Sequence, residues 1–177
     1  MDTVILPMLP TDYPAVARIY QQGIESGHAT FELKPPVNWE AWSKTKFAGC
    51  NLAAVQTEAI NLHSDLGRSV IGWAAISPFS SRRVYAGVGE VSIYIAKEAR
   101  GQGVGSQLLQ APIEVATRAG FWTLQAGIFP ENEASVRLHC KHGFRIVGVR
   151  EKLGRMELGP LAGQWRDVLL LERRNHE

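Results

Sequence analysis

The sequence has few of the features that mark secreted, membrane or nucleic-acid-binding proteins. Its 177 residues include only two cysteines, Cys50 and Cys140, too few for a disulfide framework and too isolated for a zinc site. The longest apolar run, Val70 to Ile76, is far shorter than the roughly 18 residues of a membrane span. Nineteen basic against seventeen acidic residues leave a formal charge of only +2. We therefore expect no metal, no nucleic acid and no membrane partner.

The N-terminus also lacks the pattern of a secretory signal. Asp2 stands where a signal would carry basic residues, and Pro7 interrupts the first apolar stretch. Together with the isolated cysteines, this predicts a reduced, cytoplasmic setting. A hydrophobic content of 45% and a charged content of 20% are typical of a globular chain. The length predicts one domain spanning residues 1–177.

Hydrophobic periodicity and turn residues predict an α/β (α+β) fold, a mixed sheet with helices on it. Thr11 is expected to cap the first helix, Gly23 to help end it, and Pro112 to kink or shorten a later one. In 90–96 the side chains alternate, so one face is expected in the core and the other, with Glu90 and Tyr94, is expected to meet a substrate. Strands are predicted at 3–6, 52–56, 69–77, 90–96, 123–129, 144–150 and 165–172. Helices are predicted from Thr11, around 39–47, and over 104–119 and 132–142.

A glycine-rich run from Arg100 to Ser106 follows a predicted strand and opens a predicted helix. Unpaired N–H groups and the positive end of the helix dipole meet there, which favours an anion such as a pyrophosphate. The run lacks the lysine of a Walker A motif, and Ser106 stands where a dinucleotide-binding pattern needs its third glycine. A glycine-rich connection with no ligand is the alternative.

The order of elements, with Arg100-x-x-Gly103-x-Gly105 before the helix, resembles the GNAT acyltransferases. That resemblance implies a mixed, mostly antiparallel sheet, flanked by helices and splayed at an acetyl-CoA site. Further stretches resemble the phosphinothricin N-acetyltransferase family, which includes enzymes for methionine sulfoximine and arsinothricin. They are Ala29–Glu32, Ser77–Phe79 with Arg82 and Tyr85, Glu90–Ile95, Phe129–Ser135, Leu138–His139 with Gly143–Phe144, and Gly163–Val168. The connection from Glu151 to Arg166 is more similar to the arsinothricin relatives.

The resemblance implies a catalytic base and suggests an acid. Acetyl transfer needs a neutral amine, a polarised thioester and protonation of the departing thiolate. Glu90 matches the acidic position associated with deprotonating the acceptor amine, directly or through one water. His139 stands where many GNAT members carry a tyrosine proposed to protonate the thiolate. The alternatives are a solvent-exposed carboxylate for Glu90 and a packed or cofactor-lining ring for His139.

By the same resemblance, acetyl-CoA is the cosubstrate. The backbone of the strand predicted at 90–96 would run beside the pantetheine arm, and the glycine-rich run would hold the pyrophosphate. Asn132 and Ser135 would contact the pantetheine, although an asparagine at that place can equally cap a helix. The expected contacts are Ile93, Tyr94, Ile95, Arg100, Gly101, Gln102, Gly103, Val104, Gly105, Ser106, Asn132 and Ser135.

The acceptor pocket is expected to contain Phe31, Glu32, Arg82 and Tyr85. A guanidinium at Arg82 can pair with a carboxylate or a phosphinate. Its neighbour Arg83 can do so instead. The family usually has proline at the position of Arg83, so this sequence departs from the family pattern there. The resemblance also implies a homodimer.

The resulting prediction is N-acetylation of the α-amine of a small amino-acid analogue of the phosphinothricin, methionine sulfoximine or arsinothricin type, by direct transfer in a ternary complex. Protein N-termini and polyamines are alternative acceptors, and a CoA-binding sensor without catalysis is an alternative of another class. The arginine pair disfavours polyamines, and the presence of Glu90 disfavours the sensor.

Overall fold

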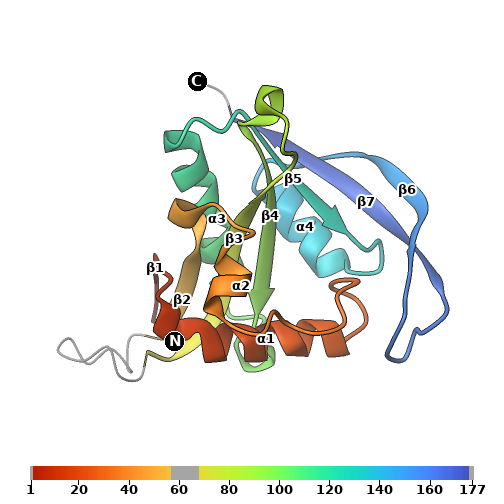
Figure 1. Cartoon of the computed structure of the whole chain (residues 1–177), viewed down its shortest axis with the longest axis horizontal. Helices are drawn as coiled ribbons and strands as arrows, with labels where there is room; N and C mark the ends of the chain where they lie inside the picture. Colours follow the sequence, from red (N-terminus) through yellow and green to blue (C-terminus); the bar gives the residue numbers. More distant parts are fainter. Residues whose placement is uncertain (1, 57–67, 176–177) are drawn as a thin grey trace.

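The strands of the computed structural model, which describes residues 2–56 and 68–175, form one twisted sheet in the order β1-β2-β3-β4-β5-β7-β6 (Figure 1). All neighbouring strands are antiparallel except β4 and β5, which are parallel. This confirms the predicted fold class, a mixed and mostly antiparallel sheet. The strands are β1 Thr3–Pro7, β2 Leu52–Gln56, β3 Val70–Pro78, β4 Val88–Ile95, β5 Thr123–Ile128, β6 Arg145–Arg155 and β7 Trp165–Arg174.

Helices pack on both faces of the sheet. The residues of β4 illustrate this, because neighbouring side chains along the strand contact helices on opposite faces. The ring of Tyr94 stacks on Trp73 of β3 at 4.6 Å and lies 4.8 Å from Tyr20 of α1. Val91 belongs instead to a second apolar cluster, which includes Leu109 of α3. Tyr94 is thus partly buried against the apolar cluster, and with Glu90 and Ser92 of the same face it also lines a cavity. The helices are α1 Tyr13–Glu25, α2 Trp39–Ser43, α3 Val104–Arg118 and α4 Glu133–Lys141.

Strands β4 and β5 separate soon after they meet. Their parallel register joins only three pairs of residues, Val88–Glu90 with Thr123–Gln125. Beyond Glu90, β4 continues to Ile95 with a partner only on the β3 side. The backbone of this half of β4 therefore faces an opening rather than another strand. The predicted splay of the sheet is confirmed.

Most predicted elements are found, and the differences lie at their ends. Thr11 does not cap α1, because a 3-10 turn over Pro10–Asp12 precedes the helix and the Asp12 carboxylate accepts from the N–H of Leu9 at 2.8 Å. Pro112 does not shorten α3, which runs on to Arg118. Strand β6 continues to Arg155, five residues further than predicted, because it stays paired with β7. The turn residues from Asn61 to Gly67, which predict a hairpin connection between the strands at 52–56 and 69–77, lie outside the described residues.

Gly23 lies inside α1 rather than at its end, and it allows the aromatic stack to approach the helix. A Cβ atom at Gly23 would lie 2.7 Å from Cε1 of Tyr94. The Tyr94 ring cannot simply move away, because it is held between Trp73 and Tyr20. The glycine is thus required by packing and not by helix termination.

We expect Gly23→Ala to lower the free energy of unfolding by about 1–3 kcal/mol, because the clash outweighs the roughly 1 kcal/mol that alanine gains in a helix interior. Urea denaturation measures the change. Gly49→Ala is the matched control, since a Cβ atom at Gly49 would have nothing within 4 Å. Equal effects of the two substitutions would contradict the packing explanation.

Candidate active site

A cavity of about 360 Å³ opens where β4 and β5 separate. Val91–Tyr94 of β4 and Ala126–Phe129 of the β5 end form its two walls. Eight of the sequence-predicted site residues line it together: Phe31, Glu32, Glu90, Ile93, Tyr94, Asn132, Ser135 and His139. The structure therefore brings residues from three separate segments of the chain to one site, as the family resemblance implied.

Glu90 lies on β4 at the point where the two strands part. It is directly opposite Ser77 of β3 and Gln125 of β5 in the sheet register. Its Oε2 accepts a hydrogen bond from Nε2 of Gln125 at 3.1 Å. The carboxylate is otherwise exposed and lines the cavity, so it can accept a proton from a group bound there.

His139 is the most deeply buried polar group at the site, with an exposed fraction of 2%. Its Nδ1 lies 2.8 Å from the carbonyl oxygen of Ser135, an acceptor, so Nδ1 carries the hydrogen. Burial lowers the pKa of His139, although the hydrogen bond to Ser135 opposes this shift, and the ring is therefore neutral near pH 7. Its Nε2 is then a bare acceptor, and it has no partner among the residues that the structure describes.

The glycine-rich run before α3 has the conformation that an anion site requires. Gly101 and Gly103 have φ angles of 75° and 82°, a left-handed region that side chains disfavour. Within the described chain, the N–H groups from Gln102 to Gly105 have no backbone acceptor. Their arrangement at the N-terminus of a 15-residue helix fits a diphosphate. The hydroxyl of Ser106, the last residue of the run, lies 2.9 Å from Nε2 of His142.

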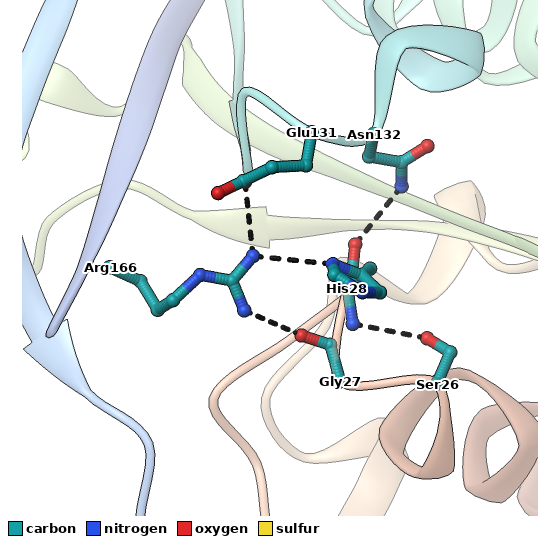
Figure 2. Close-up of polar contacts among 6 residues, drawn as sticks. All are labelled: Ser26, Gly27, His28, Glu131, Asn132 and Arg166. Atoms are coloured by element: carbon teal, nitrogen blue, oxygen red, sulfur yellow. Dashed lines mark hydrogen bonds and ion pairs between the residues drawn. The ribbon is translucent and has the colours of Figure 1, made fainter. Parts of the chain in front are cut away.

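Asn132 caps α4 and ties that helix to the loop after α1. Its Oδ1 accepts from the N–H of Ser135 at 3.2 Å, and its Nδ2 donates to the carbonyl of His28 at 3.2 Å (Figure 2). The capping alternative considered for Asn132 is thus correct. One amide hydrogen is left to meet a ligand in the cavity.

The loop after α1, which carries Phe31 and Glu32, is held in place by Arg166 of β7 (Figure 2). The guanidinium is 4% exposed and donates to the carbonyl of Gly27 at 2.7 Å and to Glu131 at 3.0 Å. It also lies 4.2 Å from the ring centre of Phe129, which packs edge-on against Phe31. Backbone hydrogen bonding first, and Arg166 next, lower the pKa of Glu131. Arg166 lies in one of the family-like stretches, Gly163–Val168, but its contact with Gly27 could not be predicted, because the two residues are more than a hundred positions apart in the chain.

Arg82 and Tyr85 are not among the cavity residues. They lie in the connection between β3 and β4, where the Arg82 guanidinium stands 5.4 Å from the ring of Tyr85. Arg82 and its neighbour Arg83 are both exposed. The cations that line the cavity are instead Lys46 and Arg150, which sequence reasoning missed because neither lies in a motif.

Residues 24–144 match the model of the acetyltransferase (GNAT) family. A phosphinothricin N-acetyltransferase of Streptomyces coelicolor is 35% identical over 172 residues, which cover 96% of this chain and 94% of that protein. An L-methionine sulfoximine/L-methionine sulfone acetyltransferase of Pseudomonas aeruginosa is 31% identical over 163 residues, with 91% and 88% covered.

A solved structure gives the same result. The crystal structure of a GNAT superfamily phosphinothricin acetyltransferase from Sinorhizobium meliloti, in complex with acetyl-CoA, superposes with a TM-score of 0.83 at 28% identity and covers 100% of this chain and 90% of its own. The chain belongs to the acetyltransferase (GNAT) family. Within it, the chain is an acetyl-CoA-dependent N-acetyltransferase of the phosphinothricin and methionine sulfoximine acetyltransferase-like group.

We expect Arg166→Met to lower the free energy of unfolding by about 1–3 kcal/mol, because it leaves the buried carbonyl of Gly27 without its donor. Thermal or urea denaturation measures the loss. Arg137→Met is the control, since Arg137 pairs with Glu133 on the exposed face of α4 and should change stability by less than about 0.5 kcal/mol. A loss no larger than that of the control would show that Arg166 does not anchor the loop.

Proposed function

We propose that this enzyme acetylates the α-amine of a small amino-acid analogue of the phosphinothricin, methionine sulfoximine or arsinothricin type, by direct transfer in a ternary complex. The observation that carries the proposal is the position of Glu90, a carboxylate at the point where β4 leaves β5 and the cavity begins. The activities of the two relatives named above support the acceptor class.

We propose that the free edge of β4 and the glycine-rich run hold acetyl-CoA, which supplies an activated thioester when it is bound. The backbone groups of Ile93, Tyr94 and Ile95 would pair with the pantetheine amides as a neighbouring strand would. The N–H groups from Gln102 to Gly105 would bind the diphosphate. Arg100, Gly101 and Ser106 complete that loop, and Asn132 and Ser135 line the cavity beside it.

Two side chains would move the protons. Glu90 accepts one proton from the acceptor ammonium, directly or through one water, so that the neutral nitrogen can attack the thioester carbonyl. The C–N bond then forms and the C–S bond breaks, while a β4 N–H group polarises the carbonyl. Nε2 of His139 is bare, so His139 can act as the expected acid only after it has received a proton. We propose that it takes the second proton of the attacking nitrogen and passes it to the thiolate.

The acceptor would lie between Glu90 and the loop after α1. Phe31 and Glu32 line the cavity there, and Phe31 is fixed by its contact with Phe129. Arg82, or Arg83 in its place, and Tyr85 stay predictions, because their loop does not line the cavity. The cations Lys46 and Arg150 in the wall disfavour a polyamine as the acceptor.

The proposed setting and assembly rest on separate observations. Cys50 and Cys140 are both free thiols, which supports a reducing, cytoplasmic compartment. None of the helices in the described residues is long and apolar enough to cross a membrane. Edge strand β6 and its surroundings expose apolar side chains that a second copy of the chain would cover. They are Ile146, Val147, Val149, Leu153 and Trp165, each more than 40% exposed.

If the enzyme is a homodimer through this edge, analytical ultracentrifugation should give twice the chain mass of 19.5 kDa. Val149→Lys should shift the mass towards the monomer, because it would bury a charge in the interface. Val84→Lys changes another exposed valine outside β6 and should have no effect. A monomeric wild type would reject the dimer.

The test of the proposed function is release of CoA thiol from acetyl-CoA with phosphinothricin, methionine sulfoximine, arsinothricin, ordinary amino acids, polyamines and a peptide. We expect turnover of the amino-acid analogues and a fall in kcat of about 10²–10⁴-fold in Glu90→Gln, with the acetyl-CoA affinity unchanged. Glu114→Gln, on the exposed side of α3, is the control.

The other outcomes separate the alternatives. Binding of acetyl-CoA without turnover of any acceptor would favour the sensor. Turnover of peptides or polyamines alone would replace the acceptor class. A Glu90→Gln variant with the wild-type rate would remove Glu90 from catalysis while leaving the activity itself in place.

A further inference from the structure

A row of polar side chains crosses three strands at the wall of the cavity. Nζ of Lys46 donates to Oγ of Ser77 on β3 at 2.8 Å. Ser77 is directly opposite Glu90 on β4, which in turn accepts from Gln125 on β5. Residues directly opposite each other share one face of a sheet, with Cβ atoms about 5 Å apart. An ammonium, a hydroxyl and the proposed catalytic carboxylate therefore lie side by side on the cavity face.

Lys46 is held in this place by its neighbours in the chain. The N–H of Phe47 donates to the carbonyl of Ile76 on β3 at 2.9 Å, and the Phe47 ring packs edge-on against Phe121 at 4.7 Å. The Lys46 ammonium also lies 6.0 Å from the ring centre of the buried Trp42. The segment after α2 is thus fastened to β3, and it directs this one side chain into the cavity.

The ammonium of Lys46 has no carboxylate in contact. Among residues 2–56 and 68–175 it forms no ion pair, and Ser77, a neutral group, is its hydrogen-bond partner. Burial lowers the pKa of Lys46, and the more distant carboxylates of Glu90 and Glu32 act against that shift. A partly desolvated cation without an opposite charge in contact is costly, and a bound anion would relieve that cost.

The other cations near the site are less suited to this task. Arg82 and Arg83 lie outside the cavity wall, and Arg166 is already occupied by Gly27 and Glu131. Arg150 lines the cavity but is exposed on edge strand β6, which β5 and β7 separate from the strand that carries Glu90. Lys46 is the cation attached to the same polar row as the proposed base.

We propose that Lys46 binds the α-carboxylate of the acceptor, so that the acceptor's amine is presented to Glu90. This inference rests on the proposed function and narrows it, because it makes the α-carboxylate a requirement of the site. The cation of Lys46 beside the carboxylates of Glu90 and Glu32 is complementary to a carboxylate and an ammonium on one carbon. A simple amine would leave the Lys46 ammonium unpaired and would be a poor acceptor.

The test compares an acceptor with its own carboxamide, which removes the negative charge and keeps the amine and the side chain. Methionine sulfoximine is suitable, because its carboxylate is its only anionic group. We expect the wild type to prefer the free acid by about 10- to 100-fold in kcat/KM, mostly through KM. Lys46→Met should reduce that preference to within about threefold, and Lys46→Arg should keep part of it. The acetyl-CoA affinity, measured by calorimetry, should stay within about twofold of the wild type.

Lys44→Met is the matched control, because Lys44 is exposed two residues earlier on the same segment. Equal losses with acid and carboxamide in Lys46→Met would overturn the proposal, since they would show that Lys46 acts on Glu90 or on the fold. If the wild type acetylates neither compound, the proposed function fails first. Calorimetric titration of the CoA complex with the acid and with the carboxamide then tests whether Lys46 binds the carboxylate. If the wild type and Lys46→Met show the same preference for the acid, the proposed role of Lys46 is rejected.

Discussion

The separation of β4 from β5 governs every other feature of the site. Two parallel strands that pair over only three residues leave one edge of β4 without a partner, and its backbone groups must find ligands elsewhere. The same separation opens the cavity and leaves Glu90 at its mouth. A closed sheet would satisfy the backbone but would have no room for a second substrate between the strands.

Packing on both sides of the opening keeps it from collapsing. Tyr94 is stacked between Trp73 and Tyr20, so the unpaired half of β4 is fixed by its side chains rather than by a neighbouring strand. Across the opening, the buried guanidinium of Arg166 joins the loop after α1 to β7 and to the start of α4. The residues that hold the walls of the cavity in place, Tyr94 and Arg166, are thus different from the unpaired β4 backbone that a ligand would contact. The cavity is therefore already formed before a ligand binds.

The chemistry of the cavity comes from uneven burial of its polar groups. His139 is buried and its pKa is lowered, so Nε2 is a hydrogen-bond acceptor that is shielded from solvent. Glu90, in contrast, is exposed at the point where β4 leaves β5. Lys46 lies between these extremes, since it is partly desolvated and holds its charge beside a hydroxyl and two more distant carboxylates. The same three side chain types with a different degree of burial would not have these separate roles.

Patterns along the chain were enough to predict the order of elements, the glycine-rich run before α3 and the family, because periodicity and motifs are local or follow one another in sequence. They also predicted eight of the residues that meet in the cavity. Knowledge of the folded chain was needed to see that Pro112 is accommodated and that the ring of Tyr94 packs on Trp73 and Tyr20. It was also needed to see that Arg82 lies outside the cavity and that Lys46 and Arg166 matter. These outcomes depend on strand register and on contacts between distant segments, such as Arg166 with Gly27, which no local pattern encodes.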